Sequence, residues 1–267
     1  MRRPRILTIA VLVLVVFLYA PLIVVILFAF NGGNNLSWPI HSLSLHWFHV
    51  LLSDPSFSSA FYMSVRVSTS VAVIAAVIGT AASIAFVRRR MPLTTALEGL
   101  SRLCVMLPPL FLAIGLFTAM DLFNITPGFA TIVVGQLLYV IPYVLVVVTA
   151  RLIGFDLELE QVARDLGAGP LQALRRITFR IVAPAILGAA ILAFAFSFDE
   201  VLITNFTAGE QATLPLYVFS KLRRTVDPTV NAVATVLIVI PWIALGVAWF
   251  IVRTRGFGEN RSRSTLA

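Results

Sequence analysis

Long apolar segments alternate with shorter polar ones along the whole chain. Six of the apolar segments are long enough to cross the hydrocarbon core of a bilayer, because about 20 helical residues span about 30 Å. These segments are residues 6–30, 59–87, 100–123, 129–152, 181–206 and 231–252. The pattern therefore predicts an all-α integral membrane protein with six transmembrane helices in a single domain, residues 1–267.

The stretch at residues 155–180, FDLELEQVARDLGAGPLQALRRITFR, departs from this pattern because it is rich in charged residues. Apolar positions at helical spacing predict two short helices within it. Gly167 and Gly169 lie between them and suit a chain reversal, since glycine adopts a positive φ at little cost. Such a helical hairpin is either a docking element for a soluble partner or an ordinary loop between spans, and the spacing alone leaves both open.

Composition supports the membrane assignment. Of all residues, 59% are hydrophobic and 12% are charged, whereas soluble domains have about 25% charged residues. Lys and Arg (20) outnumber Asp and Glu (12), but basic residues also mark cytoplasmic loops, so the excess does not indicate nucleic acid. The sequence has no His/Cys cluster with metal-ligand spacing, no phosphate-binding glycine loop and no nucleophilic triad motif. We therefore expect no metal site, no cofactor bound by this chain and no catalytic residue.

The basic residues divide unequally between the two sides of the membrane that six spans would create. Sixteen arginines fall at the N-terminus, between the second and third spans, around the 155–180 hairpin and in the C-terminal tail. The opposite side carries only Lys221, Arg223 and Arg224. Because cytoplasmic loops are enriched in Lys and Arg, this distribution predicts that both termini and the hairpin are cytoplasmic.

Ionisable residues within the predicted spans are the candidates for a function. Asp199 and Glu200 follow Phe198 in the fifth span, where each charged residue costs about 2.5–3.5 kcal/mol on insertion scales. Carboxylates beside aromatic faces suit the path of an organic cation, through ion pairing and cation–π contact. The alternative is a structural role, in which Arg66 of the second span or water at the outer surface satisfies both carboxylates. The residues alone leave both interpretations open.

Several segments are similar to a known family: ARLIGFDLELEQVARDLGAG (150–169), SFDEVLITNFTAG (197–209) and TLPLYVFSKL (213–222). They resemble permease subunits of bacterial ABC importers, whose cytoplasmic EAA loop corresponds to the hairpin. Within that family, the chain most resembles the second permease subunit of the spermidine/putrescine type. The resemblance implies the type I ABC importer permease fold, a place in the bacterial cytoplasmic (inner) membrane, and transport of a small organic cation such as a polyamine.

The resemblance also implies partners. A permease of this kind forms a hetero-oligomer with a second permease subunit, receives cargo from a periplasmic substrate-binding protein, and is driven by a separate ATP-binding subunit that uses ATP and Mg²⁺. Membrane lipid surrounds it, and nucleic acid is not expected. In this family the EAA loop contacts the ATP-binding subunit, which carries that role to these positions: Glu160, Gln161, Ala163, Asp165, Gly167 and Ala168.

Two positions depart from the family pattern. Gln161 stands where the family usually has glutamate, six residues before Gly167, and Arg180 stands where a proline is frequent. Two other functions also stay open. One is an ABC permease for a different small solute, and the other is a self-sufficient secondary transporter whose embedded charges carry protons.

Overall fold

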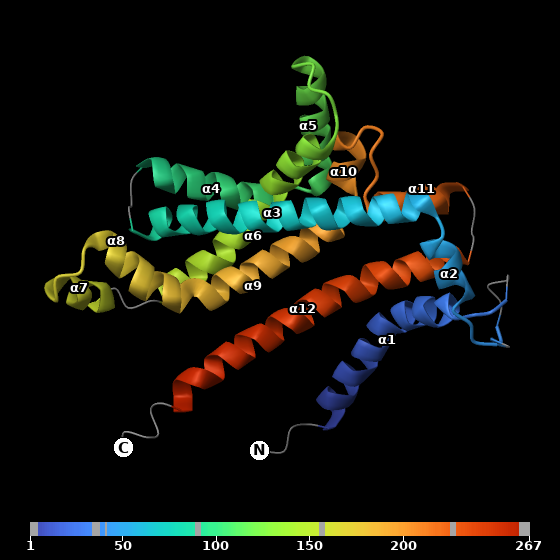
Figure 1. Ribbon diagram of the computed structural model, residues 1–267, viewed down its shortest axis with the longest axis horizontal. Helices are drawn as coiled ribbons and strands as arrows, with labels where there is room; N and C mark the ends of the chain where they lie inside the picture. Colours follow the sequence, from blue (N-terminus) through green and yellow to red (C-terminus); the bar gives the residue numbers. More distant parts are fainter. Residues whose placement is uncertain are drawn as a thin grey trace. The chain divides into compact units, whose positions relative to one another are not determined.

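The computed structural model describes residues 5–33, 38–40, 42–88, 92–154, 158–224 and 228–261. Over these residues the chain consists of helices and their connections, with one isolated β-bridge between Asn31 and Leu43 (Figure 1). The helices are α1 (Arg5–Ala29), α2 (His46–Leu52), α3 (Pro55–Arg88), α4 (Pro92–Met106), α5 (Pro109–Leu122), α6 (Phe129–Ile153), α7 (Glu158–Asp165), α8 (Pro170–Ala173), the π-helix η1 (Leu174–Thr178), α9 (Phe179–Phe198), α10 (Leu202–Thr207), α11 (Leu214–Arg224) and α12 (Thr229–Arg261). The predicted all-α class is confirmed.

The chain forms two compact units. Unit 1 contains residues 1–61 and 214–240, and unit 2 contains residues 62–213 and 241–267. The long helices α3 and α12 each contribute residues to both units. The hairpin, the two embedded carboxylates and Arg66 all belong to unit 2.

Four helical segments of the described chain are long and apolar enough to cross a membrane: Leu7–Ala29, Pro55–Arg88, Phe129–Ile153 and Pro170–Phe198. A fifth exists if Thr94–Met106 and Pro109–Leu122, which meet at 109°, form one broken span, and Thr229–Ala244 is a shorter apolar helix. The break has a local cause, because the Pro108–Pro109 pair lacks two N–H donors and disfavours a helical residue before it. The total of six spans remains a prediction.

In unit 2, α6 and α9 pack along each other (Figure 1). Their core includes side chains that are at most 1% exposed: Val140, Val144, Val148, Ala189 and Ala193. Gly79 of α3 also lies close to α6, since a Cβ at this position would be 2.6 Å from Cγ1 of Val144. Small residues allow membrane helices to approach this closely, and the packing gives unit 2 a fixed frame for its polar residues.

In unit 1, a polar contact joins α11 to the connection between α2 and α3. The Tyr217 hydroxyl donates a hydrogen bond to Oδ2 of Asp54 at 2.7 Å, and Nζ of Lys221 lies 3.5 Å from the same oxygen. The hydrogen bond from Tyr217 is the main reason that the pKa of Asp54 lies below its usual value, although partial burial acts in the opposite direction. The Phe57 and Tyr217 rings meet edge to face at 6.3 Å beside it.

Helix α1 is apolar on every side, and its described side chains from Leu7 to Ile23 are exposed within this chain, Phe17 by 74%. A helix that is apolar all round is stable where lipid or another apolar subunit surrounds it. The exposure of α1 therefore agrees with its prediction as a membrane span.

Candidate functional site

The hairpin at residues 158–178 reverses through a hydrogen-bonded glycine turn. The N–H of Gly167 donates to the carbonyl oxygen of Arg164, and the N–H of Ala168 donates to that of Ala163, both at 2.9 Å. This pair of bonds is a Schellman motif, which ends a helix with a residue of positive φ. Gly167 has φ +86°, so a side chain there would be strained. The predicted chain reversal at Gly167 is confirmed.

Glu160 of α7 points into the protein. Its carboxylate accepts hydrogen bonds from Arg88 at the end of α3 and from the Thr178 hydroxyl of η1, and Nη2 of Arg164 lies 3.7 Å away. Only 4% of the residue is exposed. The family resemblance assigned Glu160 to the contact with the ATP-binding subunit, but in this structure its carboxylate ties α7 to α3 and η1.

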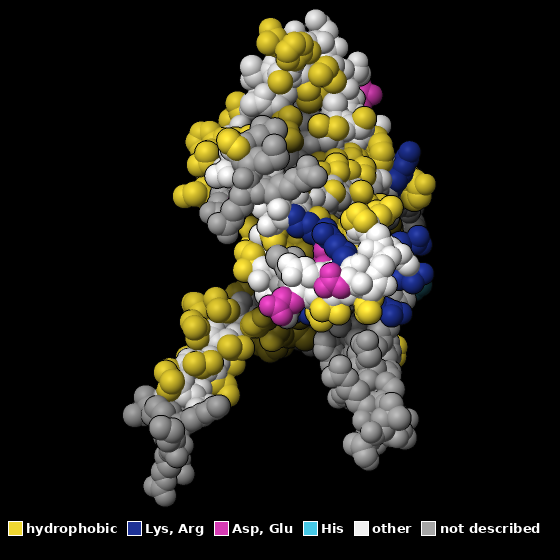
Figure 2. Space-filling view, turned by 90° about the vertical axis from the view of Figure 1, so that its left-hand side faces the viewer, with side chains coloured by type: hydrophobic (Ala, Val, Ile, Leu, Met, Phe, Trp, Pro, Cys, Tyr) yellow, Lys and Arg dark blue, Asp and Glu magenta, His cyan; other side chains and the backbone are white. Residues whose placement is uncertain are grey.

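Part of the exposed surface of α7 and of the residue after it is apolar. Leu159, Val162 and Leu166 are 46%, 55% and 84% exposed, and their spacing of three and four residues places them on one face of the helix, which we call the α7 stripe. Figure 2 views the molecule from the side on which α7 and α8 lie in Figure 1, and it shows acidic and basic side chains gathered beside apolar ones at this end. Helix α7 thus buries the Glu160 carboxylate and exposes the α7 stripe beside polar side chains such as Gln161 and Asp165.

The other predicted contact residues lie around this stripe. Gln161, Asp165 and Gly167 are exposed, whereas Ala163 and Ala168 are half-buried. The set taken from the resemblance omitted Leu159, Val162 and Leu166. Their helical spacing in an otherwise charged stretch was the signal that could have identified them.

The predicted fifth span, residues 181–206, is interrupted. Helix α9 ends at Phe198 and α10 begins at Leu202. The Glu200 carboxylate accepts hydrogen bonds from the N–H groups of Ile203 at 2.8 Å and Thr204 at 2.9 Å, so it caps the start of α10. The cap satisfies donors that a helix start leaves unpaired, which makes the break a stable local structure.

A buried polar network holds this break against α6. Nε2 of Gln136 donates to Oγ1 of Thr204 at 2.9 Å, and the Ser197 hydroxyl donates to Oε1 of Gln136. The Thr204 hydroxyl in turn lies 3.1 Å from Oε2 of Glu200. All four residues are buried, Gln136 and Thr204 completely. The network was not identified from the sequence, because its members come from three helices.

Asp199 has a different environment from Glu200. Asp199 is exposed, whereas Glu200 is 8% exposed and Phe198 is fully buried and stacked on Phe194. Phe196 precedes Asp199 by three residues, so the two lie on one side of the helix end. Phe198, which the sequence placed beside a possible cargo path, is therefore covered by other side chains in this structure.

The exposed side of α9 carries an aromatic cluster with α6. The Phe196 ring lies 4.8 Å from the Tyr143 ring and 6.3 Å from the Tyr139 ring, and the two tyrosine rings are 5.3 Å apart. All three residues are half-buried, so their rings are partly accessible. Phe196 of this aromatic cluster belongs to the last turn of α9, and Asp199 directly follows that helix.

Arg66 does not make the ion pair considered from the sequence. Its guanidinium lies over the Phe129 ring, with Cζ 4.4 Å from the centroid. Among the described residues, neither Asp199 nor Glu200 forms an ion pair with it. The cation–π contact on Phe129 gives Arg66 a favourable partner on α6, and Glu200 already has backbone donors.

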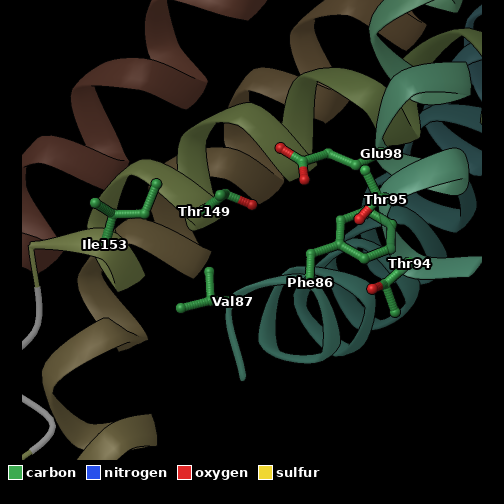
Figure 3. Close-up of a pocket in the computed structure, with 7 residues that line it drawn as sticks. All are labelled: Phe86, Val87, Thr94, Thr95, Glu98, Thr149 and Ile153. Atoms are coloured by element: carbon green, nitrogen blue, oxygen red, sulfur yellow. The ribbon is translucent and has the colours of Figure 1, made fainter. Parts of the chain in front are cut away.

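A hollow of about 390 Å³ opens between the ends of α3, α4 and α6 (Figure 3). Its lining consists of Phe86, Val87, Thr94, Thr95, Glu98, Thr149 and Ile153. One carboxylate and three hydroxyl groups give it a polar, acidic character. Glu98 was not singled out by the sequence, since nothing in its spacing connects it to Thr149.

Residues 75–255 match the family described as "Binding-protein-dependent transport system inner membrane component". The chain belongs to this family. The match begins within α3 and ends within α12, so this inner membrane component contains both the hairpin and the α9–α10 break inside the family range. The resemblance to importer permeases is confirmed, and the chain is a transport component of the membrane and not an enzyme.

Two curated relatives and one solved structure are similar to this inner membrane component. It is 30% identical over 239 residues to the spermidine/putrescine transport system permease protein PotC of Haemophilus influenzae, covering 89% of this chain and 92% of PotC. It is 32% identical over 252 residues to the putrescine transport system permease protein PotI of Escherichia coli, covering 88% and 86%. A bacterial alginate ABC transporter, solved with a periplasmic protein bound to an alginate pentasaccharide, has a chain with TM-score 0.64 and 15% identity, covering 92% of this chain and 91% of that one. That likeness supports the ABC transporter permease fold.

Proposed function

We propose that this inner membrane component is the permease subunit of an ATP-driven importer for a small organic cation of the polyamine class, such as putrescine or spermidine. The observation that carries the choice of cargo is the aromatic cluster of Tyr139, Tyr143 and Phe196, together with exposed Asp199 directly after the end of α9. The names of PotC and PotI point to the same class of cargo.

The chemistry of this face suits an alkylammonium group. A cation over an aromatic ring gains about 0.5–2 kcal/mol, depending on its desolvation. A carboxylate at the helix end adds an ion pair, and the tyrosine hydroxyls can accept hydrogen bonds from the ammonium. Asp199 and Phe196 therefore form the proposed contact for cargo, while Glu200 and Phe198 support the backbone behind it.

The α7 stripe is the proposed docking surface for a separate ATP-binding subunit. Leu159, Val162 and Leu166 would enter an apolar cleft of that subunit, with Gln161 and Asp165 at the rim. The partner would bind ATP and Mg²⁺, since no such site is expected in this chain. In this arrangement Gln161, which replaces the usual glutamate of the family, contacts the partner at the rim of the cleft. It does not provide the negative charge that a glutamate would carry there.

The buried Glu160 carboxylate makes the proposed attachment stiff. It bonds to α3 through Arg88 and to η1 through Thr178, so movement of α7 is passed to two helices. Removing one partner of a buried ion pair leaves an uncompensated charge, which is strongly unfavourable. A rigid connection of this kind transmits rigid-body closure of a partner to the spans.

Further partners follow from the same proposal. A second permease subunit would pair with this chain, and a periplasmic binding protein would deliver cargo from outside, as the complex of the alginate ABC transporter with its periplasmic protein suggests. The excess of arginines on the hairpin side supports cytoplasmic termini and a cytoplasmic hairpin. The aqueous face of unit 1 around Tyr217 and Asp54 would then be periplasmic.

The cargo proposal is tested by uptake of labelled spermidine and putrescine into proteoliposomes that contain the complete transporter. We expect Asp199→Asn to weaken the apparent affinity for the cation about tenfold, equivalent to about 1.4 kcal/mol, because the ion pair is lost. Asp121→Asn is the matched control, since Asp121 is an exposed carboxylate at the end of α5. Unchanged uptake in both Asp199→Asn and Tyr143→Ala would remove this face from the cargo path.

A further inference from the structure

A second concentration of charge lies where the hairpin becomes α9. Arg175 and Arg176 belong to η1, and Arg180 belongs to the first turn of α9. With Phe179 and Ala183 they surround an open hollow of about 560 Å³, and all five residues are exposed. We call these five residues the basic hollow. None of them takes part in the cargo face or in the α7 stripe.

Local backbone geometry brings the arginines together. Arg176 of η1 and Arg180 of α9 are four residues apart across the junction of the two helices, so they lie on the same side, and Arg175 directly precedes Arg176. Phe179 and Ala183, four residues apart, continue that side along α9. The hollow therefore combines arginines of η1 and of the first turn of α9 with the apolar side chains of Phe179 and Ala183. Arg180 is the position where a proline is frequent in the family.

The basic hollow has no carboxylate of its own. Among the described residues, Arg175, Arg176 and Arg180 form no ion pair, and Glu160 on the neighbouring α7 is occupied by Arg88, Thr178 and Arg164. Three guanidinium groups around one space strongly favour an anion. The guanidinium group matches the geometry of phosphate because it offers a planar fork of donors.

The position of the three arginines along the chain favours a lipid phosphate over a free phosphate ion. The segment Pro170–Phe198 is long and apolar enough to cross the membrane, and the arginines lie near its polar end, which a membrane-spanning α9 would place at the depth of the lipid headgroups. A free phosphate ion would gain nothing from the exposed Phe179 ring and Ala183. A lipid would place its acyl chains against them. Basic residues beside the cytoplasmic ends of spans attract anionic lipids, each contributing about 1 kcal/mol.

We propose that the basic hollow binds the phosphate headgroup of an anionic membrane lipid, with Phe179 and Ala183 alongside its acyl chain. Bound lipid would hold α8 and η1, the part of the hairpin after the glycine turn, at the membrane surface. A force applied to α7 would then move the spans and would not tilt the hairpin. The inference depends on α9 crossing the membrane and does not depend on which cargo is transported.

The test is native mass spectrometry of the full-length protein in a neutral detergent, titrated separately with phosphatidylglycerol, phosphatidylcholine and inorganic phosphate. We expect phosphatidylglycerol to bind, phosphatidylcholine to bind much more weakly, and inorganic phosphate not to displace the lipid. Each of Arg175→Gln, Arg176→Gln and Arg180→Gln should weaken phosphatidylglycerol binding about fivefold. Arg180→Lys should retain most of the binding because it keeps the charge.

Arg151→Gln is the matched control, since Arg151 is an exposed arginine at the end of α6 outside the basic hollow. Equal losses in Arg151→Gln and Arg180→Gln would overturn the proposal, because they would indicate a non-specific charge effect. Displacement by inorganic phosphate alone would show a free-anion site and would also overturn it. So would a triple glutamine variant that binds phosphatidylglycerol normally but no longer binds the ATP-binding subunit, since the surface would then be a protein interface.

Discussion

At the scale of single residues, Glu200 accepts hydrogen bonds from two backbone N–H groups of α10, while Asp199 beside it is exposed. A buried carboxylate with backbone donors is a structural group, because its removal leaves those donors without an acceptor. An exposed carboxylate at a helix end that accepts no such backbone hydrogen bonds is available for a ligand. The two neighbours therefore separate into a capping residue and a cargo candidate.

This separation predicts unequal effects of two alanine substitutions on stability. Glu200→Ala should lower the free energy of unfolding by about 1–3 kcal/mol, since two buried N–H groups lose their acceptor. Asp199→Ala should change it by less than about 0.5 kcal/mol. Thermal unfolding of the two variants in the same detergent measures the difference. Equal shifts of Tm would contradict the assignment of Glu200 as the cap.

The sequence identified Asp199 and Glu200 as unusual because charged residues are costly inside a span. It could not assign their roles, since the environment of Glu200 depends on contacts across the fold. Gln136, which bonds to Thr204 and Ser197, is 68 and 61 residues away from them in the chain. The position of Arg66 over the Phe129 ring could likewise not be predicted, because that ring carries no charge to attract notice.

At the scale of elements, α7 places Glu160 inward and leaves Leu159 and Val162 exposed, with Leu166 directly after its end. Contact of the exposed stripe with water is unfavourable on an isolated protein. Exposed apolar patches on otherwise polar surfaces commonly mark binding sites. Glu160 and the Schellman turn hold the helix in an orientation that keeps the stripe on the surface. The hairpin is therefore ordered before any partner binds, which lowers the entropic cost of docking.

The docking proposal predicts that Leu166→Asp weakens binding of the ATP-binding subunit by about 2 kcal/mol or more, the usual cost of disrupting a central apolar contact. Leu171→Asp is the control, because Leu171 is 75% exposed but lies on α8, outside the α7 stripe. Copurification of the partner with each variant measures the effect. Normal copurification with Leu166→Asp would exclude the stripe as the docking surface.

The contact between α11 and Asp54 predicts a dependence on acidic pH. The pKa of Asp54 is lowered in the folded protein, mainly by the hydrogen bond from Tyr217. Its contribution to stability is therefore complete above the ordinary pKa of about 3.9 and is lost as the pH falls below that value. The protection factors of the α11 amides against hydrogen exchange, each referred to the intrinsic exchange rate at the same pH, should fall below about pH 4. Tyr217→Phe should abolish most of this change, and an unaltered pH profile in that variant would contradict the assignment.

The hairpin itself was predictable, because glycine, proline and helical spacing are local signals. The inward orientation of Glu160 was not, because Arg88 lies 72 residues away in the chain. The break at the Pro108–Pro109 pair was also visible in the sequence, whereas the break after Phe198 was not. The first follows from proline chemistry, and the second depends on a carboxylate cap and a distant glutamine.

At the scale of the whole molecule, hydropathy was sufficient to predict an all-α membrane protein. The segments that bury little of their surface within this chain are also informative, since α1 leaves apolar side chains exposed on every side. Such a chain needs lipid and other subunits to cover it. This agrees with membership in a family of components of a multi-protein transport system.

The most direct test of the central claim is cargo uptake by this chain alone, compared with uptake by the chain assembled with its second permease, ATP-binding and periplasmic binding proteins. Both preparations are reconstituted in the same proteoliposomes and supplied with labelled spermidine or putrescine, with and without ATP and Mg²⁺. A permease subunit predicts uptake only in the complete assembly and only with ATP. Uptake by this chain alone, driven by a proton gradient, would contradict the account and identify a secondary transporter.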